Sequence, residues 1–490
     1  MIYDKYELVI GLEVHAQLLT KSKLFCGDSI SFGAEPNTHV SPVALAHPGT
    51  LPVMNKEVIA LAVKLGIALN CKIEQHNYFA RKNYFYPDLP KGYQVSQHTA
   101  PICNGGYLSI QTAKGKKDVH LNRIHMEEDA GKSIHDLFEN FTAIDLNRAG
   151  TPLLEIVTEP DMHSAEEAFA YITELRKLVR WLDVCDGNME EGSLRCDANV
   201  SVRLKGETTL GTRVEVKNLN SIRNVKKAIE IEAERLIEII ESGGKVTQET
   251  RSFNADNNTT FSLRSKEEAD DYRYFPEPDL PPFNITEEYI NAVKKGMPAL
   301  PATLQEKYIS IHGLSAYDAA MICADKEDAA FYEAIAANSN NYKATANWIT
   351  GPIRNYCNEK EMSIQNFPLD ADRISELIQF TESGKIHFNT ASTKLMDAMI
   401  ADKDSLPETL AASMNLLQEN NTDALQKWVD ETIASMPEKV KEYRAGKKGL
   451  IGLFAGQVKK LSKGKADMET VTKMLEASLN PSEGGTSNAV

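Results

Sequence analysis

The chain has 490 residues, a formal net charge of −15 and an ordinary hydrophobic share of 42%. Its length predicts about three domains, and its acidity argues against nucleic-acid or membrane binding over the whole surface, though not against a local basic patch. Its seven cysteines include no CxxC pair, which favours reduced thiols. No signal-peptide core is visible and no apolar run approaches the roughly 18 residues that span a bilayer, so we expect a cytoplasmic protein without a membrane segment.

The first predicted element is a strand over residues 8–18. Its apolar residues occupy every second position, which is the spacing of a half-buried strand. The positions between them carry Gly11, Glu13, His15 and Gln17, so a carboxylate, an imidazole and an amide share one face. Taken alone, this pattern favours a solvated strand face; the return of similar faces later in the chain favours a binding site.

A helix is predicted to begin after Asn55, a plausible N-cap. Residues 79–94 then form the densest aromatic and basic stretch, and their prolines and Gly92 predict an ordered loop. Cations such as Lys82 and Lys91 amid aromatic rings suit a phosphate together with a base or sugar. The alternative, a packed aromatic loop with solvated lysines, stays open.

Two further segments contain acidic residues in unusual settings. Residues 131–133 read Gly-Lys-Ser, but a phosphate-binding loop requires a glycine where Met126 stands, so we reject that motif. The preceding residues 127–129 are all acidic and form either a solvated strand end or part of a metal site. Glu155 lies inside an apolar strand pattern, where a lone carboxylate is costly unless it is paired or binds a metal.

Long amphipathic helices are predicted over 164–182, opened by Ser164 and Glu167 in capping-box spacing, and over 221–240. Between them the alternating pattern returns over 194–203 and 212–217, with Arg195, Asp197 and Lys217 among the polar positions. These strands predict one sheet with a dry face and a mixed-charge face. Carboxylates and an imidazole suit Mg²⁺, and arginines and lysines suit phosphate oxygens.

Beyond about residue 295, helical periodicity and helix caps replace the strand patterns, so a β-rich half is followed by an all-α half. Near the C-terminus, residues 439–465 form a basic island opposed only by Glu442. It contains the glycine-punctuated apolar stretch 449–457, where a backbone or ligand can come close. The island predicts a footprint for RNA or an acidic partner; a solvated lysine-rich helix face is the alternative.

Seven motifs in order give the chain a specific resemblance. They are Gly11-Leu-Glu-Val-His15, Arg81-Lys-Asn-Tyr-Phe-Tyr-Pro-Asp-Leu-Pro90, His125-Met-Glu-Glu-Asp-Ala-Gly-Lys132, Asp145-Leu-Asn-Arg-Ala-Gly-Thr-Pro152, Glu190-Glu-Gly-Ser-Leu-Arg-Cys-Asp-Ala-Asn199, Lys217-Asn-Leu-Asn-Ser221 and Asp271-Tyr-Arg-Tyr-Phe-Pro-Glu-Pro-Asp279. Over nearly its full length the chain closely resembles the GatB family, the B subunits of the aspartyl/glutamyl-tRNA amidotransferases.

The resemblance implies an α+β protein in three parts: an antiparallel-sheet cradle over 1–294, a helical domain over 295–408 and a tRNA-binding tail domain over 409–480. Composition predicts that residues 481–490 are disordered. The implied heterotrimer, completed by subunits A and C, uses ATP and Mg²⁺ to phosphorylate the side-chain carboxylate of Asp or Glu misacylated on tRNA(Asn) or tRNA(Gln), and then displaces the phosphate with ammonia. The chain has no Gly-Ser-Ser-Gly or G-x-S-x-G segment, so we expect its glutaminase partner, the first of these two chains, to hydrolyse glutamine.

The resemblance also implies functional residues. The expected catalytic and metal-binding residues are Glu13, His15, Glu128 and Glu155, with Asp197 as a further metal contact. The expected phosphate contacts are Lys82, Lys91, Arg195 and Lys217. The expected tRNA contacts are Lys447, Lys448, Lys459, Lys460 and Lys463.

One departure concerns zinc. Many family members hold a zinc ion with four cysteines, whereas the matching positions here are Cys26, Asp28, Ser41 and Ala44, so we predict no structural zinc. Two rival functions stay open: a tRNA-binding scaffold without its own catalytic site, and a free-standing ATP-dependent carboxylate–amine ligase.

Overall fold

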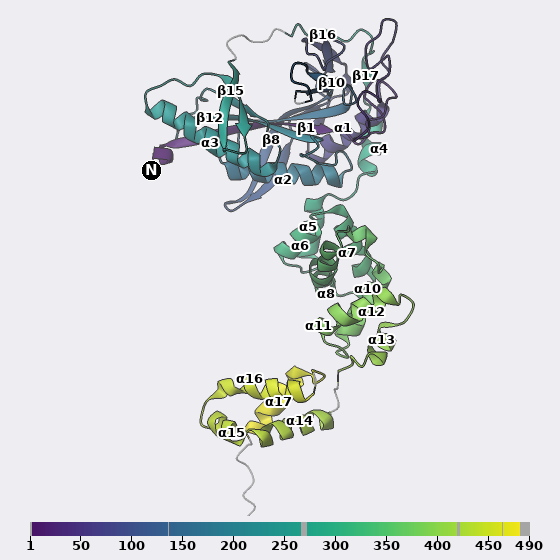
Figure 1. Cartoon of the computed structure of the whole chain (residues 1–490), viewed down its shortest axis with the longest axis vertical. Coiled ribbons are helices and arrows are strands. Elements are labelled where there is room, and N and C mark those ends of the chain that lie inside the picture. Colours follow the sequence, from purple (N-terminus) through teal and green to yellow (C-terminus); the bar gives the residue numbers. More distant parts are fainter. Residues whose placement is uncertain (1, 136, 266–271, 419–421, 463, 481–490) are drawn as a thin grey trace, which may run out of the picture. The chain divides into compact units, whose positions relative to one another are not determined.

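The computed structural model describes residues 2–135, 137–265, 272–418, 422–462 and 464–480. The chain divides into two compact units, Met1–Leu300 and Pro301–Val490. The first unit is built on a large sheet and the second is helical (Figure 1), so the predicted α+β class is confirmed. The predicted boundary at residue 294 falls near the end of helix α4 (Glu287–Lys295), shortly before this division.

The first unit is organised around a 10-stranded sheet. Its strand order is β15 (Thr259–Ser265), β14 (Glu249–Asn254), β13 (Val214–Lys217), β12 (Leu194–Leu204), β1 (Tyr6–Gln17), β11 (Pro152–Thr158), β8 (Gly115–Glu128), β6 (Cys103–Asn104) and β2 (Lys72–Ile73), with β7 (Tyr107–Thr112) paired to β8. The expectation of an antiparallel sheet needs one correction, since β13 and β14 run parallel. Helix α3 (Ile222–Glu241) connects them, and a parallel pair requires such a crossover.

The predicted alternation of the first strand is confirmed. Leu12, Val14 and Ala16 are fully buried on one face of β1. Helices α2 (Ala165–Trp181) and α3 pack against each other and against β7 and β12, and both run along one side of the sheet (Figure 1). The apolar face is therefore covered by helices, which leaves the polar side chains of the same strands on the other face.

The predicted helix starts are also confirmed. Asn55 caps α1 (Lys56–Ala68), Ser164 caps α2 and Ser221 caps α3, each accepting a backbone N–H with its side chain. The N-cap oxygen replaces the hydrogen-bond partner that a first-turn N–H lacks. These local signals are independent of the tertiary fold, which is why the sequence reveals them.

The stretch 79–94 is not simply the ordered loop that we expected. Its two ends, β4 (Ala80–Asn83) and β5 (Tyr93–Ser96), pair as an antiparallel hairpin, and β16 (Phe275–Pro276) adds a third strand. The pairing of β16 with β4 joins segments far apart in the chain, so local signals could not reveal it. Two smaller pairs complete the first unit: β3 (His76–Asn77) with β17 (Phe283–Asn284), and β9 (Lys132–Ile134) with β10 (Ala143–Asp145).

The second unit begins with a series of short helices. These are α5 (Pro301–Ser310), α6 (Ala316–Ile322), α7 (Lys326–Ser339), α8 (Tyr342–Trp348), α9 (Arg354–Glu359), α10 (Ala371–Glu382), α11 (Phe388–Thr390), α12 (Met396–Ala401) and α13 (Pro407–Ser413). The helix expected over 344–356 widens into a π-helical turn at Ile349–Ile353 that contains Pro352. Proline lacks the N–H that an α-helix interior requires, which accounts for this irregularity.

Four helices near the C-terminus share a core of their own. They are α14 (Thr422–Ser435), α15 (Pro437–Arg444), α16 (Ile451–Leu461) and α17 (Met468–Leu479). Val429, Phe454, Val458 and Leu475 are fully buried in this core. The separation of this part as a tail domain stays a prediction, and its predicted disordered end, 481–490, lies outside the described residues. Among the described helices, none is long and apolar enough to cross a membrane.

Candidate metal and phosphate site

Strand pairing aligns four polar residues in one row across the middle of the sheet. The register places Glu155 of β11 opposite both His125 of β8 and His15 of β1, and His15 in turn opposite Arg195 of β12. Directly opposed residues project to the same face. The row therefore alternates imidazole, carboxylate, imidazole and guanidinium on the face that the helices leave open.

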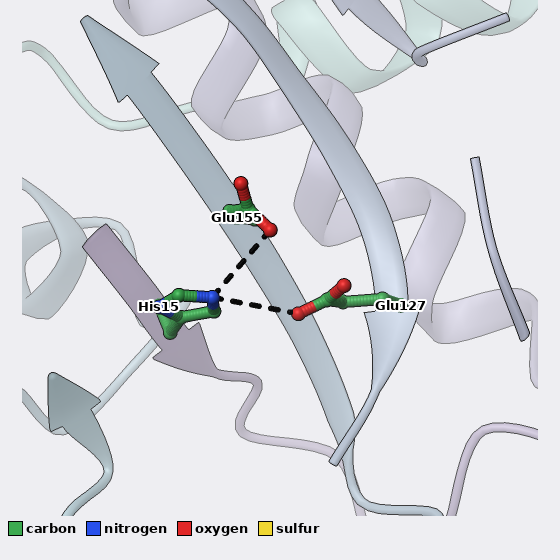
Figure 2. Close-up of side chains that lie close together, drawn as sticks. All are labelled: His15, Glu127 and Glu155. Atoms are coloured by element: carbon green, nitrogen blue, oxygen red, sulfur yellow. Dashed lines mark ion pairs between the residues drawn. The ribbon is translucent and has the colours of Figure 1, made fainter. Parts of the chain in front are cut away.

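His15, Glu127 and Glu155 form a compact cluster in this row. His15 Nε2 lies 3.5 Å from Glu155 Oε2 and 3.6 Å from Glu127 Oε1. One ligand atom from each residue lies within 4.8 Å of the other two. Figure 2 shows the three side chains pointing toward a common centre from neighbouring strands. The cluster is half-buried: His15 has 20%, Glu155 15% and Glu127 5% of its side chain exposed.

A second histidine supports the two carboxylates. His125 is buried, and its Nε2 lies 3.3 Å from Glu155 Oε2 and 3.6 Å from Glu127 Oε2. Burial lowers the pKa of His125, but hydrogen bonding to Glu127 and Glu155 outweighs burial and raises it to about 9. Burial likewise opposes protonation of His15, yet Glu155 and Glu127 raise its pKa above 6.5. Burial raises the pKa of Glu155, but the two histidines outweigh it and lower that pKa well below 4.5.

Glu128 does not join this cluster, so Glu127 takes the place for which we predicted Glu128. The carboxylate of Glu128 pairs with Lys91 and accepts the Val95 backbone N–H at 2.9 Å. Neighbouring side chains of a strand point to opposite faces, and His125 and Glu127 share the polar one. The predicted phosphate contact Lys91 is consequently neutralised by a carboxylate.

The other predicted metal contacts lie in the next row of the same face. Glu13 is opposite Asp197 and accepts a hydrogen bond from Asn199 Nδ2 at 2.9 Å. Asp197 pairs with Lys217, whose Nζ lies 2.5 Å from its Oδ2 and 3.1 Å from Glu215 Oε1. Burial lowers the pKa of Lys217, but these two carboxylates raise it above 10.5. Glu13 and Asp197 thus flank the cluster.

Arg195 is held by Asp129, the last residue of the acidic triplet. Its guanidinium donates to Asp129 Oδ2 at 3.0 Å, and Gln17 Nε2 donates to the same oxygen at 2.8 Å. Gln17 also lines a cavity of about 740 Å³, together with Arg148 and Ser193. A space of that size beside the polar face is comparable to small-molecule sites in other proteins.

Aromatic side chains from the hairpin and from the segment that leads into β16 lie close to the cluster. The ammonium group of Lys82 lies 4.8 Å from the centre of the Tyr272 ring. Burial and the charge of Glu127 raise the pKa of Tyr84, and burial together with nearby acidic groups raises that of Tyr274 to about 12. The two phenols therefore remain protonated donors near the carboxylates.

Sequence reasoning missed Glu127, His125 and Arg123 as candidate site residues. The signal was present, because these three residues alternate with the buried Ile124 and Met126 in the same period of two as the other strands. The acidic triplet drew attention to composition instead of phase.

The predicted tail residues lie on or beside α16. Lys447, Lys448, Lys459 and Lys460 are exposed, whereas Lys463 lies outside the described residues. Lys447 pairs with Glu442 at 3.1 Å and Lys448 donates to Asn480 at 2.6 Å. Part of the positive charge is therefore already compensated locally.

The positions that match the family's zinc ligands hold a hydrogen-bonded link instead. Asp28 Oδ2 accepts the Ser41 backbone N–H at 2.8 Å and the Cys26 thiol at 3.3 Å. Burial, followed by interactions with Asp28, raises the pKa of the Cys26 thiol, which disfavours the thiolate that zinc requires. With Ala44 offering no ligand, these residues do not fit a zinc ion.

By contrast, the cluster on the sheet fits a divalent cation. Two carboxylates and one imidazole converge from three strands and leave space for further ligands. Mg²⁺ prefers oxygen ligands and retains waters or phosphate oxygens beside one or two carboxylates. The donor set is therefore compatible with Mg²⁺.

Comparison with known proteins agrees with the predicted resemblance. Residues 8–291 match the GatB/GatE catalytic domain family, and residues 330–479 match the GatB domain family. The class is that of the tRNA-dependent amidotransferases. The aspartyl/glutamyl-tRNA(Asn/Gln) amidotransferase B subunit of Geotalea uraniireducens is 48% identical over 479 residues, which cover 97% of this chain and 100% of the relative. The corresponding protein of Chlorobaculum tepidum is 48% identical over 475 residues, covering 97% of this chain and 99% of the relative. The chain therefore belongs to the family of aspartyl/glutamyl-tRNA(Asn/Gln) amidotransferase B subunits.

Proposed function

We propose that this chain activates the side-chain carboxylate of aspartate or glutamate misacylated on tRNA(Asn) or tRNA(Gln), using the polar face of its sheet. A carboxylate oxygen attacks the terminal phosphorus of ATP and ADP leaves. Ammonia then attacks the acyl carbon and displaces phosphate, which gives the amide. A free carboxylate is inert to ammonia, so its oxygen must first become part of a leaving group.

The observation that supports this function is the convergence of His15, Glu127 and Glu155 within a face that also carries cations. Mg²⁺ bound there supplies charge neutralisation for the phosphates. His125 holds both carboxylates in position from the neighbouring strand. Such a site needs no nucleophile of its own, because positioning and electrostatic stabilisation account for most catalysis of phosphoryl transfer.

Flanking residues have distinct roles in this proposal. Arg195 is fixed by Asp129, and Lys217 by Asp197, so each presents its charge from a constrained position. Tyr84 and Tyr274 keep their hydroxyl protons and lie near the cluster. The cavity beside Gln17 offers room for a part of the substrate that the cations do not hold.

The tail supplies the RNA contact in this proposal. Gly449, Gly452 and Gly456 have no described neighbour within 4 Å of the position that a Cβ would occupy, so none of them serves internal packing. Gly452, Gly456 and Lys460 are spaced by four residues on α16 and therefore share one face of the helix. Bare backbone beside exposed lysines suits a phosphodiester chain.

The partners in this proposal are those of the family resemblance. Subunits A and C complete a cytoplasmic heterotrimer, in which the glutaminase partner provides ammonia from glutamine. The relatives are named as one lettered component of an amidotransferase, which implies a complex of several chains. Both misacylated tRNAs are candidate substrates.

The test uses the heterotrimer reconstituted with subunits A and C and each misacylated tRNA in turn. Glu155→Ala and Glu13→Ala are compared with Glu7→Ala, whose residue lies on the same strand face as Glu13 but pairs with Arg203. We expect the Glu155 variant to lose ATP-dependent amidation while it still binds tRNA, and the Glu7 variant to remain active. Full activity of both site variants would leave a tRNA-binding scaffold as the function, and amidation of free aspartate by the chain alone would indicate a free-standing ligase.

A further inference from the structure

Most of the described cations on the polar face already have carboxylate partners. Lys91 pairs with Glu128, Arg195 with Asp129, and Lys217 with both Asp197 and Glu215. These pairs lie around the cluster and reduce the charge that remains for an incoming anion. A phosphate chain is best held by cations that are not neutralised in advance.

Arg123 differs from these cations. It lies on β8 opposite Val157, two residues before His125, so its side chain projects to the face of the cluster. Among the described residues, its guanidinium has no ion-pair or hydrogen-bond partner, and its Nε is buried without an acceptor. A buried donor without a partner costs about 1–3 kcal/mol in the folded protein, and a bound anion would supply the missing acceptor.

The surroundings of Arg123 gather positive charge beside an aromatic surface. The rings of His98 and Tyr274 stack with centroids 3.9 Å apart and an interplanar angle of 8°. Burial, followed by the charges of Arg123, His125 and Lys82, lowers the pKa of His98. Lys82, which comes from the hairpin, contacts the rings of Tyr84 and Tyr272 and has no carboxylate partner among the described residues. Arg123 and Lys82 thus bring two unneutralised charges to one side of the cluster.

We propose that Arg123 is a further phosphate-binding residue of this site and that, together with Lys82, it binds the phosphate chain of the nucleotide next to the His15–Glu127–Glu155 cluster. The inference rests on the proposed function and adds a ligand contact to it. A guanidinium donates two parallel hydrogen bonds to phosphate oxygens, which lysine cannot reproduce. The buried Nε is placed to be one of these donors.

The experiment measures binding of Mg²⁺-ATP, Mg²⁺-ADP and adenosine to the reconstituted heterotrimer by calorimetry. The variants are Arg123→Gln and Arg123→Lys. The matched control is Arg203→Gln, since Arg203 is an arginine of the same sheet face that already pairs with Glu7 at 2.8 Å. Because Arg123 has no partner to lose, we expect both Arg123 variants to melt within a few degrees of the wild type.

We expect Arg123→Gln to weaken ATP binding about 10- to 100-fold, the range for a lost charged hydrogen bond, without changing adenosine binding. Arg123→Lys should fall between this variant and the wild type, and Arg203→Gln should bind as the wild type does. An Arg123→Gln complex with wild-type ATP affinity, or with an equal loss for adenosine, would overturn this inference alone. A wild-type complex that binds no ATP would overturn the proposed function and this inference with it.

Discussion

Glu127 and Glu128 are neighbours in the chain, yet their carboxylates serve different parts of the fold. Glu127 joins His15 at 3.6 Å in the cluster, whereas Glu128 pairs with Lys91 and receives the Val95 N–H. One belongs to the polar face of the sheet and the other anchors the 79–94 hairpin. The two residues therefore offer a direct comparison of a ligand with a structural carboxylate.

Replacing these two glutamates by glutamine should have opposite consequences. Glu127→Gln is expected to weaken Mg²⁺ binding about tenfold or more with little effect on stability, because it removes a candidate ligand. Glu128→Gln is expected to cost about 1–3 kcal/mol of unfolding free energy, because it leaves Lys91 without its charged partner. Calorimetric Mg²⁺ titration and urea unfolding measure the two effects. Equal Mg²⁺ affinity in both variants would contradict this assignment.

The capping carboxylate Glu167 predicts a pH-dependent contribution to stability. It accepts the His163 backbone N–H at 2.8 Å and pairs with Lys117 at 2.7 Å. Burial raises the pKa of Glu167, but these two partners outweigh it and lower the pKa below 4.5. A carboxyl group with a lowered pKa stabilises the fold above its unfolded pKa, and this stabilisation is lost as the pH falls through the folded pKa.

Glu167→Gln should therefore cost about 1 kcal/mol near pH 7, and the difference from the wild type should shrink below about pH 4.5. Urea unfolding at several pH values measures it. Glu174→Gln is the control, since Glu174 lies on the same helix and pairs only with Lys177 one turn away. A pH-independent difference would show that the charge of Glu167 is not the cause.

Reversing the charge of Lys459 and Lys460 should weaken tRNA binding. Both are exposed at the end of α16, and each lysine that contacts a phosphate contributes about one unit to the slope of log affinity against log salt. We expect a double Lys→Glu variant to bind tRNA at least tenfold more weakly and with a shallower slope. Lys473→Glu is the control, because Lys473 already pairs with Glu469 at 2.7 Å. Filter binding over a salt series tests this.

Gly456→Leu should separate stability from RNA binding. Leucine is a better helix former than glycine, and the position is open, so the variant should be more stable by up to about 0.8 kcal/mol. The new side chain would nevertheless cover the bare backbone of α16 and weaken tRNA binding. Thermal melting and the same binding assay measure both effects. Unchanged binding would show that RNA does not approach this face.

Chelation should leave the 26–44 region intact. Asp28 links the loop segments through Cys26 and the Ser41 N–H, so we expect no stoichiometric zinc by elemental analysis and no loss of thermal stability with a zinc chelator. Asp28→Ala should cost about 1 kcal/mol, because the Ser41 N–H loses its acceptor. Stoichiometric zinc in the purified protein would contradict the prediction.

The sequence alone determined those features that depend on neighbours along the chain. The period of two in β1 predicted its buried and polar faces, and the side chains of Asn55, Ser164 and Ser221 marked the starts of three helices. A strand face and an N-cap each depend on a few adjacent residues, so these features could be predicted.

Only the tertiary structure decided which carboxylates meet. The choice of Glu127 over Glu128 depends on the register of β8 against β11, which pairs residues about thirty positions apart, and a shift of one residue exchanges the two faces of a strand. The parallel pairing of β13 with β14 and the addition of β16 to the hairpin likewise join distant segments. Local patterns carry no information about such pairings, because their energy arises from contacts that form only when the sheet assembles.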